Sequence, residues 1–423
     1  MEKFIICGGQ PLNGDVDISG MKNSALPILF GTILTKGTCE ISNLPDISDV
    51  KDSLAILESV GARVRFTGTN TVIIDTKDVM PKSPPLELVS KIRASYYLLG
   101  AMLGRFNKAQ VGYPGGCDFG NGRPIDQHIR GFELLGAKVS YESNAAITFN
   151  APDGLKGNSV YFDIASVGST INVMYAAVFA EGVTVIENAA REPHIVDTAC
   201  FLNACGANIM GAGTTTIKIK GVKELKGTSY NIAPDMIEAG TYMIAGAITK
   251  GRVRVNNIVP KHLEAITSKL IEMNVPLEIG DSYITVNPVE NLVSKTIKAN
   301  PYPGLPTDMQ PQFTALMTLA SGACTISDGI YSSRFKYKDS LISMGANIAY
   351  DEKEARLNVI GVPELKGATV KAPDLRAGAA LVLAALAAKG TTTVTNVELI
   401  ERGYDHIVEK LRSLGANIKR EKI

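Results

Sequence analysis

The chain has 423 residues, and its 43 lysines and arginines almost balance its 42 acidic residues, which leaves a formal net charge of +1. This balance excludes a protein that recruits nucleic acid or an anionic membrane through a strongly basic surface. The length predicts two or more domains, each with its own core.

No segment of the sequence predicts targeting or membrane insertion. The chain begins Met-Glu-Lys-Phe-Ile-Ile-Cys-Gly-Gly, which has an early acidic residue and glycines and does not resemble a signal peptide. The longest apolar run, 377–388, is shorter than the roughly 20 residues of a membrane-spanning helix. We therefore expect a cytoplasmic protein without a membrane partner.

A sixfold repeat organises the chain. One short phrase, which first reads Ser59-Val-Gly-Ala-Arg-Val64, recurs at intervals of 68 to 75 residues. Its third position is a residue type that tolerates the left-handed conformation ending a helix: Gly61, Gly136, Gly206, Asn274, Gly345 and Gly415. Each of these positions is expected to lie between a helix and a strand. The first of these strands is predicted at 63–66.

Two further elements recur in each unit. β-branched strands that end in polar turns are predicted at 39–43, 183–188, 253–257 and 393–396. Helices rich in alanine and glycine are predicted at 23–34, 94–103, 168–180, 239–248, 311–320 and 378–388. Such helices allow close approach on every side, so we expect all six to be buried. Because the first and last units lack capping features, a closed array of three units per domain is favoured over a solenoid.

The cysteines and histidines exclude two kinds of site. The six cysteines show no CxxC pairing, which predicts free thiols in a reducing compartment: Cys7, Cys39, Cys117, Cys200, Cys205 and Cys324. The four histidines lack HxxxH or HExxH spacing, which argues against a catalytic zinc site: His128, His194, His262 and His406.

Cys117 lies in the run Tyr113-Pro-Gly-Gly-Cys-Asp-Phe-Gly-Asn-Gly-Arg-Pro124. Four glycines and two prolines oppose both a helix and a paired strand, so the cysteine is expected in an exposed loop. Arg123 is near in sequence, and a neighbouring cation favours the thiolate. The alternative is a small buried hydrophobic residue, the usual role of an unpaired cysteine. The loop composition favours the reactive thiol.

Lone cations stand where the buried helices begin and in turns after strands. Lys22 (beside Asn23), Arg93 and Arg376 fall at helix starts, where free N–H groups and partial positive charge favour anions. The turn arginines suit carboxylate or phosphate: Arg123, Arg334 and Arg402. Together they predict an anion pocket, although each helix-start cation alone could be a solvated helix-end charge.

Three acidic residues at helix starts allow two readings. Asp235, Asp308 and Asp374 could each be an N-cap, the usual role of an aspartate that follows a proline turn. Asp308, in Pro306-Thr-Asp-Met-Gln310, could instead be a functional carboxylate. The sequence leaves this choice open.

These residues resemble the UDP-N-acetylglucosamine enolpyruvyl transferase family along the whole chain. The matching motifs include Ser19-Gly-Met-Lys-Asn-Ser-Ala-Leu-Pro27, Tyr113-Pro-Gly-Gly-Cys117, Arg123-Pro-Ile-Asp-Gln-His128, Ser166-Val-Gly168, Glu187-Asn-Ala-Ala-Arg-Glu-Pro193, Pro306-Thr-Asp-Met-Gln310 and Arg402-Gly-Tyr404. The resemblance implies a two-domain inside-out α/β barrel, with three βαβαββ-like repeats per domain, helices inside and sheets outside. One departure is five residues between Cys117 and Arg123, where the family usually has four.

The resemblance implies transfer of the enolpyruvyl group of phosphoenolpyruvate to the 3′-hydroxyl of UDP-N-acetylglucosamine, with release of phosphate, as the first committed step of peptidoglycan synthesis. It implies no metal and no cofactor. Cys117 would protonate C3 of phosphoenolpyruvate and could form a covalent adduct, and Asp308 would take the hydroxyl proton. Lys22 and Arg402 would be catalytic together with Cys117 and Asp308. The phosphoenolpyruvate site would comprise Lys22, Asn23, Arg123, Arg334, Arg376 and Arg402.

By the same resemblance, the UDP-sugar site would comprise Arg93, Arg123, Pro124, Ile125, Asp126, Gln127, Ser166, Val167, Asp308 and Ile330. We expect one domain at 22–232 and a second, discontinuous domain at 1–21 and 233–423. The rival functions are 5-enolpyruvylshikimate-3-phosphate synthase, which shares this fold and chemistry, and a non-enzymatic ring clamp on DNA. The Cys117 loop argues against both, and the near-zero net charge argues against the clamp. The oligomeric state is left open.

Overall fold

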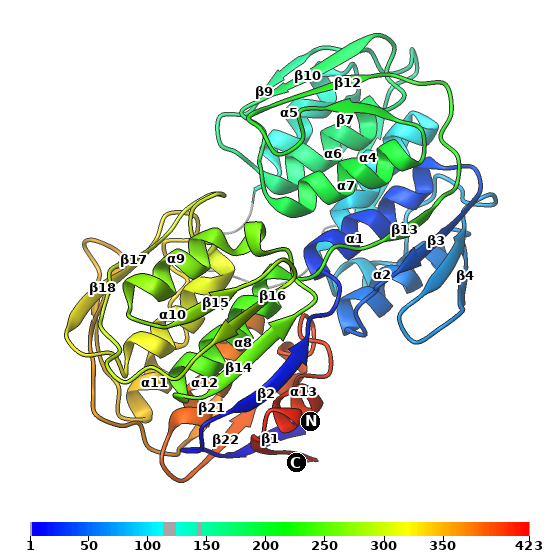
Figure 1. The fold of residues 1–423 in the computed structure, drawn as a ribbon. Helices are drawn as coiled ribbons and strands as arrows, with labels where there is room; N and C mark the ends of the chain where they lie inside the picture. Colours follow the sequence, from blue (N-terminus) through cyan, green and yellow to red (C-terminus); the bar gives the residue numbers. More distant parts are fainter. Residues whose placement is uncertain (1, 113–123, 142–145, 423) are drawn as a thin grey trace. The chain divides into compact units, whose positions relative to one another are not determined.

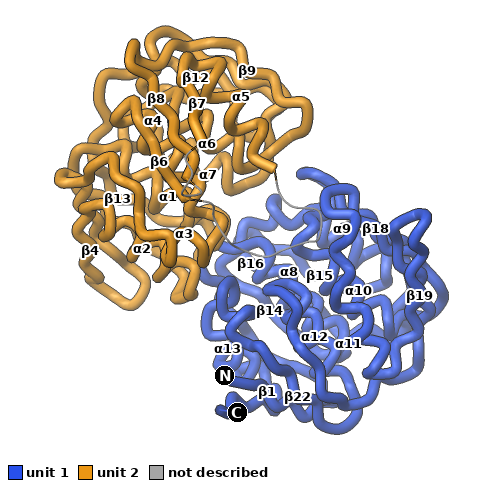
Figure 2. Tube along the Cα trace, turned by 180° about the vertical axis from the view of Figure 1, so that it is seen from behind, with its two compact units in different colours: residues 1–19, 119–121, 234–423 blue, residues 20–118, 122–233 orange. Residues whose placement is uncertain are grey.

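The computed structural model describes residues 2–112, 124–141 and 146–422 (Figure 1). The chain forms two compact units, coloured separately in Figure 2. Unit 1 contains the described residues of 1–19 and 234–423, and unit 2 contains the described residues of 20–233. The chain passes from unit 1 to unit 2 after Ser19 and returns after Ala233.

Unit 2 has three sheets, with strand orders β13-β3-β5-β4, β6-β8-β7 and β11-β12-β10-β9. The strands are β3 (Thr38–Ser42), β4 (Arg63–Phe66), β5 (Val72–Asp75), β6 (Lys108–Gly112), β7 (Lys138–Tyr141), β8 (Ala146–Asn150), β9 (Ser159–Tyr161), β10 (Val183–Glu187), β11 (Asn208–Met210), β12 (Thr216–Lys220) and β13 (Ser229–Asn231). The helices are α1 (Lys22–Gly31), η1 (Thr32–Leu34), α2 (Ser48–Ser59), α3 (Leu86–Val89), η2 (Arg93–Tyr96), α4 (Tyr97–Phe106), α5 (Asp126–Leu134), α6 (Val167–Ala177) and α7 (Pro193–Ala204).

Unit 1 also has three sheets, with strand orders β21-β22-β1-β23, β15-β16-β14-β2 and β17-β18-β20-β19. The strands are β1 (Glu2–Cys7), β2 (Asn13–Asp17), β14 (Arg252–Asn256), β15 (Leu277–Ile279), β16 (Tyr283–Val286), β17 (Ile297–Ala299), β18 (Ala323–Asp328), β19 (Asn347–Asp351), β20 (Arg356–Ile360), β21 (Thr369–Lys371), β22 (Thr391–Thr395) and β23 (Asn417–Lys422). The helices are α8 (Met236–Ile248), η3 (Pro260–Leu263), α9 (Glu264–Glu272), η4 (Thr307–Met309), α10 (Gln310–Met317), α11 (Lys338–Ser343), α12 (Leu375–Ala387), η5 (Val397–Leu399) and α13 (Ile407–Ser413).

The helices rich in small residues are buried inside each unit, as the sequence predicts. In unit 1, α8, α10 and α12 contact one another, and each also contacts a different sheet. Helix α12 has the sequence LRAGAALVLAALA and is buried from Leu375 to Leu386, because an apolar surface on all sides needs neighbours on all sides. The two-domain α/β architecture with helices inside is therefore confirmed. No helix of the described residues is long and apolar enough to cross a membrane.

The predicted left-handed positions are also confirmed. All six repeat positions, from Gly61 to Gly415, have φ between 66° and 111°. The asparagines that end four of the predicted strands have φ between 52° and 56°: Asn43, Asn188, Asn257 and Asn396. Gly and Asn are the residues that adopt this conformation at least cost, so the repeated phrase fixes the turn between helix and strand.

One repeat departs from the others. Five sheets have an edge strand parallel to its neighbour, whereas the sheet β6-β8-β7 has three strands within the described residues, all antiparallel. In this repeat the segment before the buried helix α4 contains Pro84 and Pro85 and then forms α3. Proline lacks the N–H that a ladder requires, which explains why a helical turn replaces the strand.

The two chain crossings run side by side. The Met21 amide donates to the Ala233 carbonyl over 2.8 Å, and the Asp235 amide donates to the Ser19 carbonyl over 2.9 Å. The strand before each crossing pairs within the unit that the chain is leaving. β2 precedes α1 but pairs with β14, and β13 precedes α8 but pairs with β3. The residues next to each crossing are therefore held by backbone pairing.

Candidate active site

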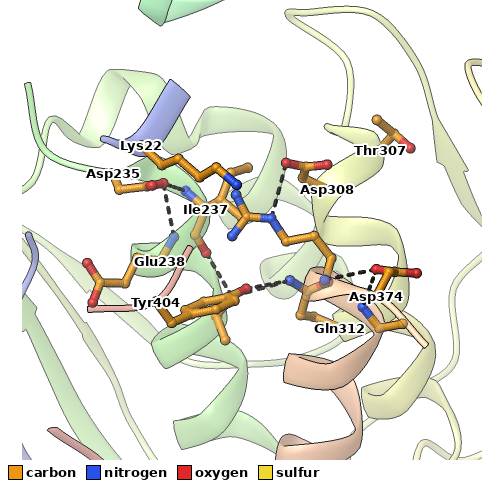
Figure 3. A network of polar contacts seen from close by, with 12 residues as sticks. Lys22, Asp235, Ile237, Glu238, Thr307, Asp308, Gln312, Asp374 and Tyr404 are labelled. Atoms are coloured by element: carbon orange, nitrogen blue, oxygen red, sulfur yellow. Dashed lines mark hydrogen bonds and ion pairs between the residues drawn. The ribbon is translucent and has the colours of Figure 1, made fainter. Parts of the chain in front are cut away.

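Asp308 lies between two arginines in unit 1. Its Oδ1 accepts a hydrogen bond from Arg334 Nη1 over 2.9 Å, and its Oδ2 accepts one from Arg376 Nε over 3.1 Å. Figure 3 shows Asp308 within this network of polar contacts. The Arg334 and Arg376 side chains are 4% and 2% exposed, whereas that of Asp308 is 26% exposed. The carboxylate is thus the more accessible member of a mostly buried cluster of charges.

The charges around Asp308 decide its protonation. Burial raises the pKa of the Asp308 carboxyl, but the charges and hydrogen bonds of Arg376 and Arg334 outweigh burial and hold this pKa well below its usual range. Asp308 is therefore a carboxylate at neutral pH. In this arrangement it is a good hydrogen-bond acceptor and a weak base.

Geometry shows which of the three aspartates are helix caps. Asp235 Oδ1 accepts from the Ile237 and Glu238 amides and caps α8, and Asp374 Oδ1 accepts from the Arg376 and Ala377 amides and caps α12. The N-cap residue of η4 is Pro306, and Asp308 lies within the first turn. Asp235 and Asp374 are therefore N-caps, while Asp308 directs its carboxylate to two guanidinium groups.

Ile330 lies in a turn that hydrogen bonds to Asp328 stabilise. Asp328 Oδ1 accepts from the Ile330 and Tyr331 amides, and its Oδ2 accepts from Thr307 Oγ1 over 2.5 Å. Thr307 also accepts from Arg334 Nη1 over 3.0 Å. Ile330 itself is 39% exposed. The end of β18 is thereby tied to the same cluster as Asp308.

In unit 2, Lys22 is the first residue of α1, as predicted, and it has a carboxylate partner. Lys22 Nζ lies 2.7 Å from Asp49 Oδ2, with side chains 11% and 4% exposed. Asn23 follows in the first turn and is half-buried. The prediction of Lys22 at a helix start is confirmed. Asp49 could not be predicted as its partner, because its approach depends on the packing of α2 against α1.

A second cluster in unit 2 surrounds the start of α6. Ser166 caps α6, since its Oγ accepts from the Ser169 amide over 3.3 Å. The imidazole of His128 packs against Gly168, where an added Cβ would lie 3.0 Å from Cε1 and Nε2. Arg93 lies over the Tyr96 ring at 5.4 Å, and the Tyr96 and His128 rings are 6.0 Å apart. Arg93, Ser166 and Val167 thus gather near the capped start of α6, together with the unpredicted His128.

The remaining predicted site residues have these positions. Pro124 and Ile125 precede α5, and Asp126 and Gln127 form its first turn. Arg402 is half-buried in the segment between η5 and α13. Cys117 and Arg123 lie outside the described residues. The structure therefore brings together Asp308, Arg334 and Arg376 in unit 1, and Arg93, Ser166 and Val167 in unit 2.

Comparison with known proteins identifies the family. Residues 6–411 match the family EPSP synthase (3-phosphoshikimate 1-carboxyvinyltransferase). The chain belongs to this family. Its relatives include UDP-N-acetylglucosamine 1-carboxyvinyltransferase of Clostridium botulinum, which is 53% identical over 99% of this chain and 100% of that protein. UDP-N-acetylglucosamine 1-carboxyvinyltransferase 2 of Bacillus anthracis is 51% identical over 100% of this chain and 97% of that protein.

Solved structures of an enolpyruvyl transferase and of an EPSP synthase have the same fold. The enolpyruvyl transferase NikO from Streptomyces tendae superimposes with a TM-score of 0.90 at 25% identity, covering 100% of this chain and 99% of that chain. EPSP synthase from Acinetobacter baumannii superimposes with a TM-score of 0.76 at 17% identity, covering 100% of both chains, which shows the fold alone.

Proposed function

We propose that this chain is a UDP-N-acetylglucosamine 1-carboxyvinyltransferase. It transfers the enolpyruvyl group of phosphoenolpyruvate to the 3′-hydroxyl of UDP-N-acetylglucosamine by addition and elimination, releases phosphate, and performs the first committed step of peptidoglycan synthesis. The observation that carries this proposal is identity of 51 to 53% with such enzymes over essentially the full chain. We further propose that the protein is located in the cytoplasm and that its reaction contributes to cell shape and cell division.

We assign the phosphoenolpyruvate site to Lys22, Asn23, Arg123, Arg334, Arg376 and Arg402. A trianionic substrate needs several cations, and guanidinium groups suit bidentate capture of phosphate and carboxylate. The buried Arg334 and Arg376 are held in place by Asp308, so they are oriented before substrate arrives. We assign the UDP-sugar site to Arg93, Arg123, Pro124, Ile125, Asp126, Gln127, Ser166, Val167, Asp308 and Ile330.

Cys117 and Asp308 are the proposed acid and base. Cys117 would donate a proton to C3 of phosphoenolpyruvate, and Asp308 would accept the proton of the sugar 3′-hydroxyl. A general base works best with a pKa near the operating pH. Because Arg334 and Arg376 lower the pKa of Asp308, bound phosphate or carboxylate that draws these guanidinium groups away would make Asp308 a stronger base. Asp308→Ala is expected to lower turnover by two or more orders of magnitude while the fold survives.

We also propose that units 1 and 2 correspond to the two domains, with boundaries near residues 22 and 233. The acceptor distinguishes the proposed function from its nearest rival. Phosphate release from phosphoenolpyruvate is measured with either UDP-N-acetylglucosamine or shikimate 3-phosphate. We expect release with the sugar nucleotide only; release with shikimate 3-phosphate alone would transfer the assignment to EPSP synthase.

The role of Cys117 has its own test. Fosfomycin is an epoxide that mimics phosphoenolpyruvate and alkylates the loop cysteine in the family that this chain resembles. We expect it to inactivate this protein by modifying Cys117. The Cys117→Asp variant should remain active and escape alkylation, because a carboxyl group can still donate a proton but attacks an epoxide poorly. Cys7 and Cys200 are exposed, so peptide mapping must separate them from Cys117. Inactivation that follows an adduct on Cys7 or Cys200 would remove Cys117 from the mechanism.

A further inference from the structure

Ser19 is the last residue of unit 1 before the chain crosses to unit 2, and its backbone and side chain are both held within unit 1. Its amide donates to Glu238 Oε2 over 2.9 Å, and its carbonyl accepts from the Asp235 amide over 2.9 Å. Its hydroxyl lies 2.7 Å from Asp405 Oδ2 and 2.7 Å from Lys410 Nζ. Four hydrogen bonds thus fix this one half-buried residue.

The groups around the Ser19 hydroxyl decide the direction of its two hydrogen bonds. Lys410 Nζ carries only donors, so the serine oxygen accepts from it. The Asp405 carboxylate carries only acceptors, so the single hydroxyl hydrogen goes to Asp405. Lys410 Nζ also donates to Glu238 Oε1 over 2.6 Å, with side chains 17% and 3% exposed. Ser19 therefore connects Asp405 to a mostly buried ion pair.

Asp405 belongs to the turn between η5 and α13, which also carries Arg402. Two side chains of this turn hold it against the rest of unit 1. The hydroxyl of the buried Tyr404 accepts from Gln312 Nε2 of α10 over 3.0 Å (Figure 3), and Asp405, whose side chain is 14% exposed, accepts from Ser19. Arg402 itself is half-buried. Its backbone is thus fixed two and three residues further along the chain.

We propose that Ser19 is a positioning residue for Arg402 and acts through Asp405. The proposal rests on the proposed function, which assigns Arg402 to the phosphoenolpyruvate site. The serine hydroxyl is a directed donor because Lys410 occupies its acceptor side and two backbone hydrogen bonds hold the residue in place. Without that donor the turn loses one of its two side-chain attachments, so the guanidinium group samples more orientations and binds an anion less well.

A merely structural role for Ser19 is the alternative. Ser19→Ala leaves the Lys410–Glu238 ion pair and both backbone hydrogen bonds of residue 19 in place, so it removes little besides the bond to Asp405. A residue that only stabilises the fold changes the amount of folded enzyme and leaves both KM values unchanged. A positioning residue raises the KM for phosphoenolpyruvate in every folded molecule, but not the KM for UDP-N-acetylglucosamine, whose assigned site does not include Arg402.

Steady-state kinetics of the folded Ser19→Ala protein test the proposal. The KM for phosphoenolpyruvate should rise about tenfold, because the effect is limited to what one hydrogen bond to a charged group contributes. The KM for UDP-N-acetylglucosamine should stay within about twofold of its original value. An unchanged KM for phosphoenolpyruvate, or an equal rise in both KM values, would overturn the proposal.

A double-mutant cycle with Asp405→Ala identifies the route. Asp405→Ala should raise the KM for phosphoenolpyruvate by a similar factor. In the Asp405→Ala background, Ser19→Ala should change this KM by less than about twofold, because the bond that connects the two residues is already gone. Equal effects of Ser19→Ala in both backgrounds would show that Ser19 does not act through Asp405, and would refute the proposal.

The matched control is Ser229→Ala. The Ser229 hydroxyl donates to Glu40 Oε2 over 3.0 Å, a serine–carboxylate hydrogen bond between β13 and β3 that involves no assigned site residue. Ser229→Ala should leave both KM values unchanged. If Ser19→Ala fails to fold, Asp405→Ala removes the same bond from its other end, and an unchanged KM for phosphoenolpyruvate would then refute the proposal. Absence of any transfer by the unmodified protein would refute the proposed function instead.

Discussion

The protonation of His128 is determined by a short chain of hydrogen bonds in unit 2. The Gly100 amide donates to Asn172 Oδ1 over 2.8 Å, which fixes the orientation of that side-chain amide. Asn172 Nδ2 must then donate to His128 Nδ1, 3.0 Å away. Nδ1 is therefore unprotonated, and the neutral ring carries its hydrogen on Nε2, at the edge that faces Gly168 and the start of α6.

Burial and, to a smaller extent, the charge of Arg93 together lower the pKa of His128 to about 3. In the unfolded chain this pKa is about 6.5. Below pH 6.5 the unfolded state binds a proton that the folded state does not, so the free energy of unfolding falls as the pH falls. Well below pH 6.5 the slope approaches about 1.4 kcal/mol per pH unit, and integration from pH 6.5 to 4.5 gives a loss of about 2.3 kcal/mol.

Replacing His128 with glutamine should remove this dependence. Urea unfolding of unmodified protein and of His128→Gln at pH 7.5, 5.5 and 4.5 gives the two slopes, and the difference between them isolates the imidazole. Nitrogen NMR of the folded protein checks the tautomer directly. A His128 titration near pH 6.5, or a hydrogen on Nδ1, would refute the reasoning.

Two other predictions address the helix packing and the anion site. Gly100→Ala would place a Cβ 2.4 Å from the Asn172 carbonyl oxygen and should destabilise the protein by about 3 kcal/mol, whereas Gly37→Ala, with its nearest atom at 3.7 Å, should stay within about 1 kcal/mol in urea unfolding; equal losses would contradict the close helix contact. Lys22→Gln and Arg402→Gln should weaken binding of phosphoenolpyruvate more than binding of UDP-N-acetylglucosamine in calorimetry, and the reverse order would show that the anion site is misassigned.

Local signals in the sequence predicted much of this fold because every repeat needs the same left-handed backbone conformation at its turns. Glycine or asparagine marks each left-handed turn, and runs such as 378–388 have no polar face, so burial follows. The exception is the repeat with Pro84 and Pro85, where the missing N–H donors accompany the helical turn α3 in place of the parallel edge strand of the other five sheets. A single-residue property overrides the pattern of the repeat there.

The sequence predicted which types of residue form the site, but it did not predict which side chains pair with one another. Asp308 and Asp374 both occupy helix starts, and only the approach of Arg334 and Arg376 from distant elements distinguishes a charge-paired carboxylate from a cap. The contact of Lys22 with Asp49 likewise depends on the packing of two helices. Such partners are set by tertiary packing, which no local pattern in one sequence encodes.

Product identification tests the central claim most directly. The protein is incubated with phosphoenolpyruvate and UDP-N-acetylglucosamine, and the sugar nucleotide is analysed by mass spectrometry while phosphate is measured in parallel. We predict one enolpyruvyl group added to the sugar nucleotide for each phosphate released, and no phosphate when UDP-N-acetylglucosamine is omitted. Phosphate release without the sugar nucleotide, or an unchanged sugar nucleotide after release, would contradict enolpyruvyl transfer.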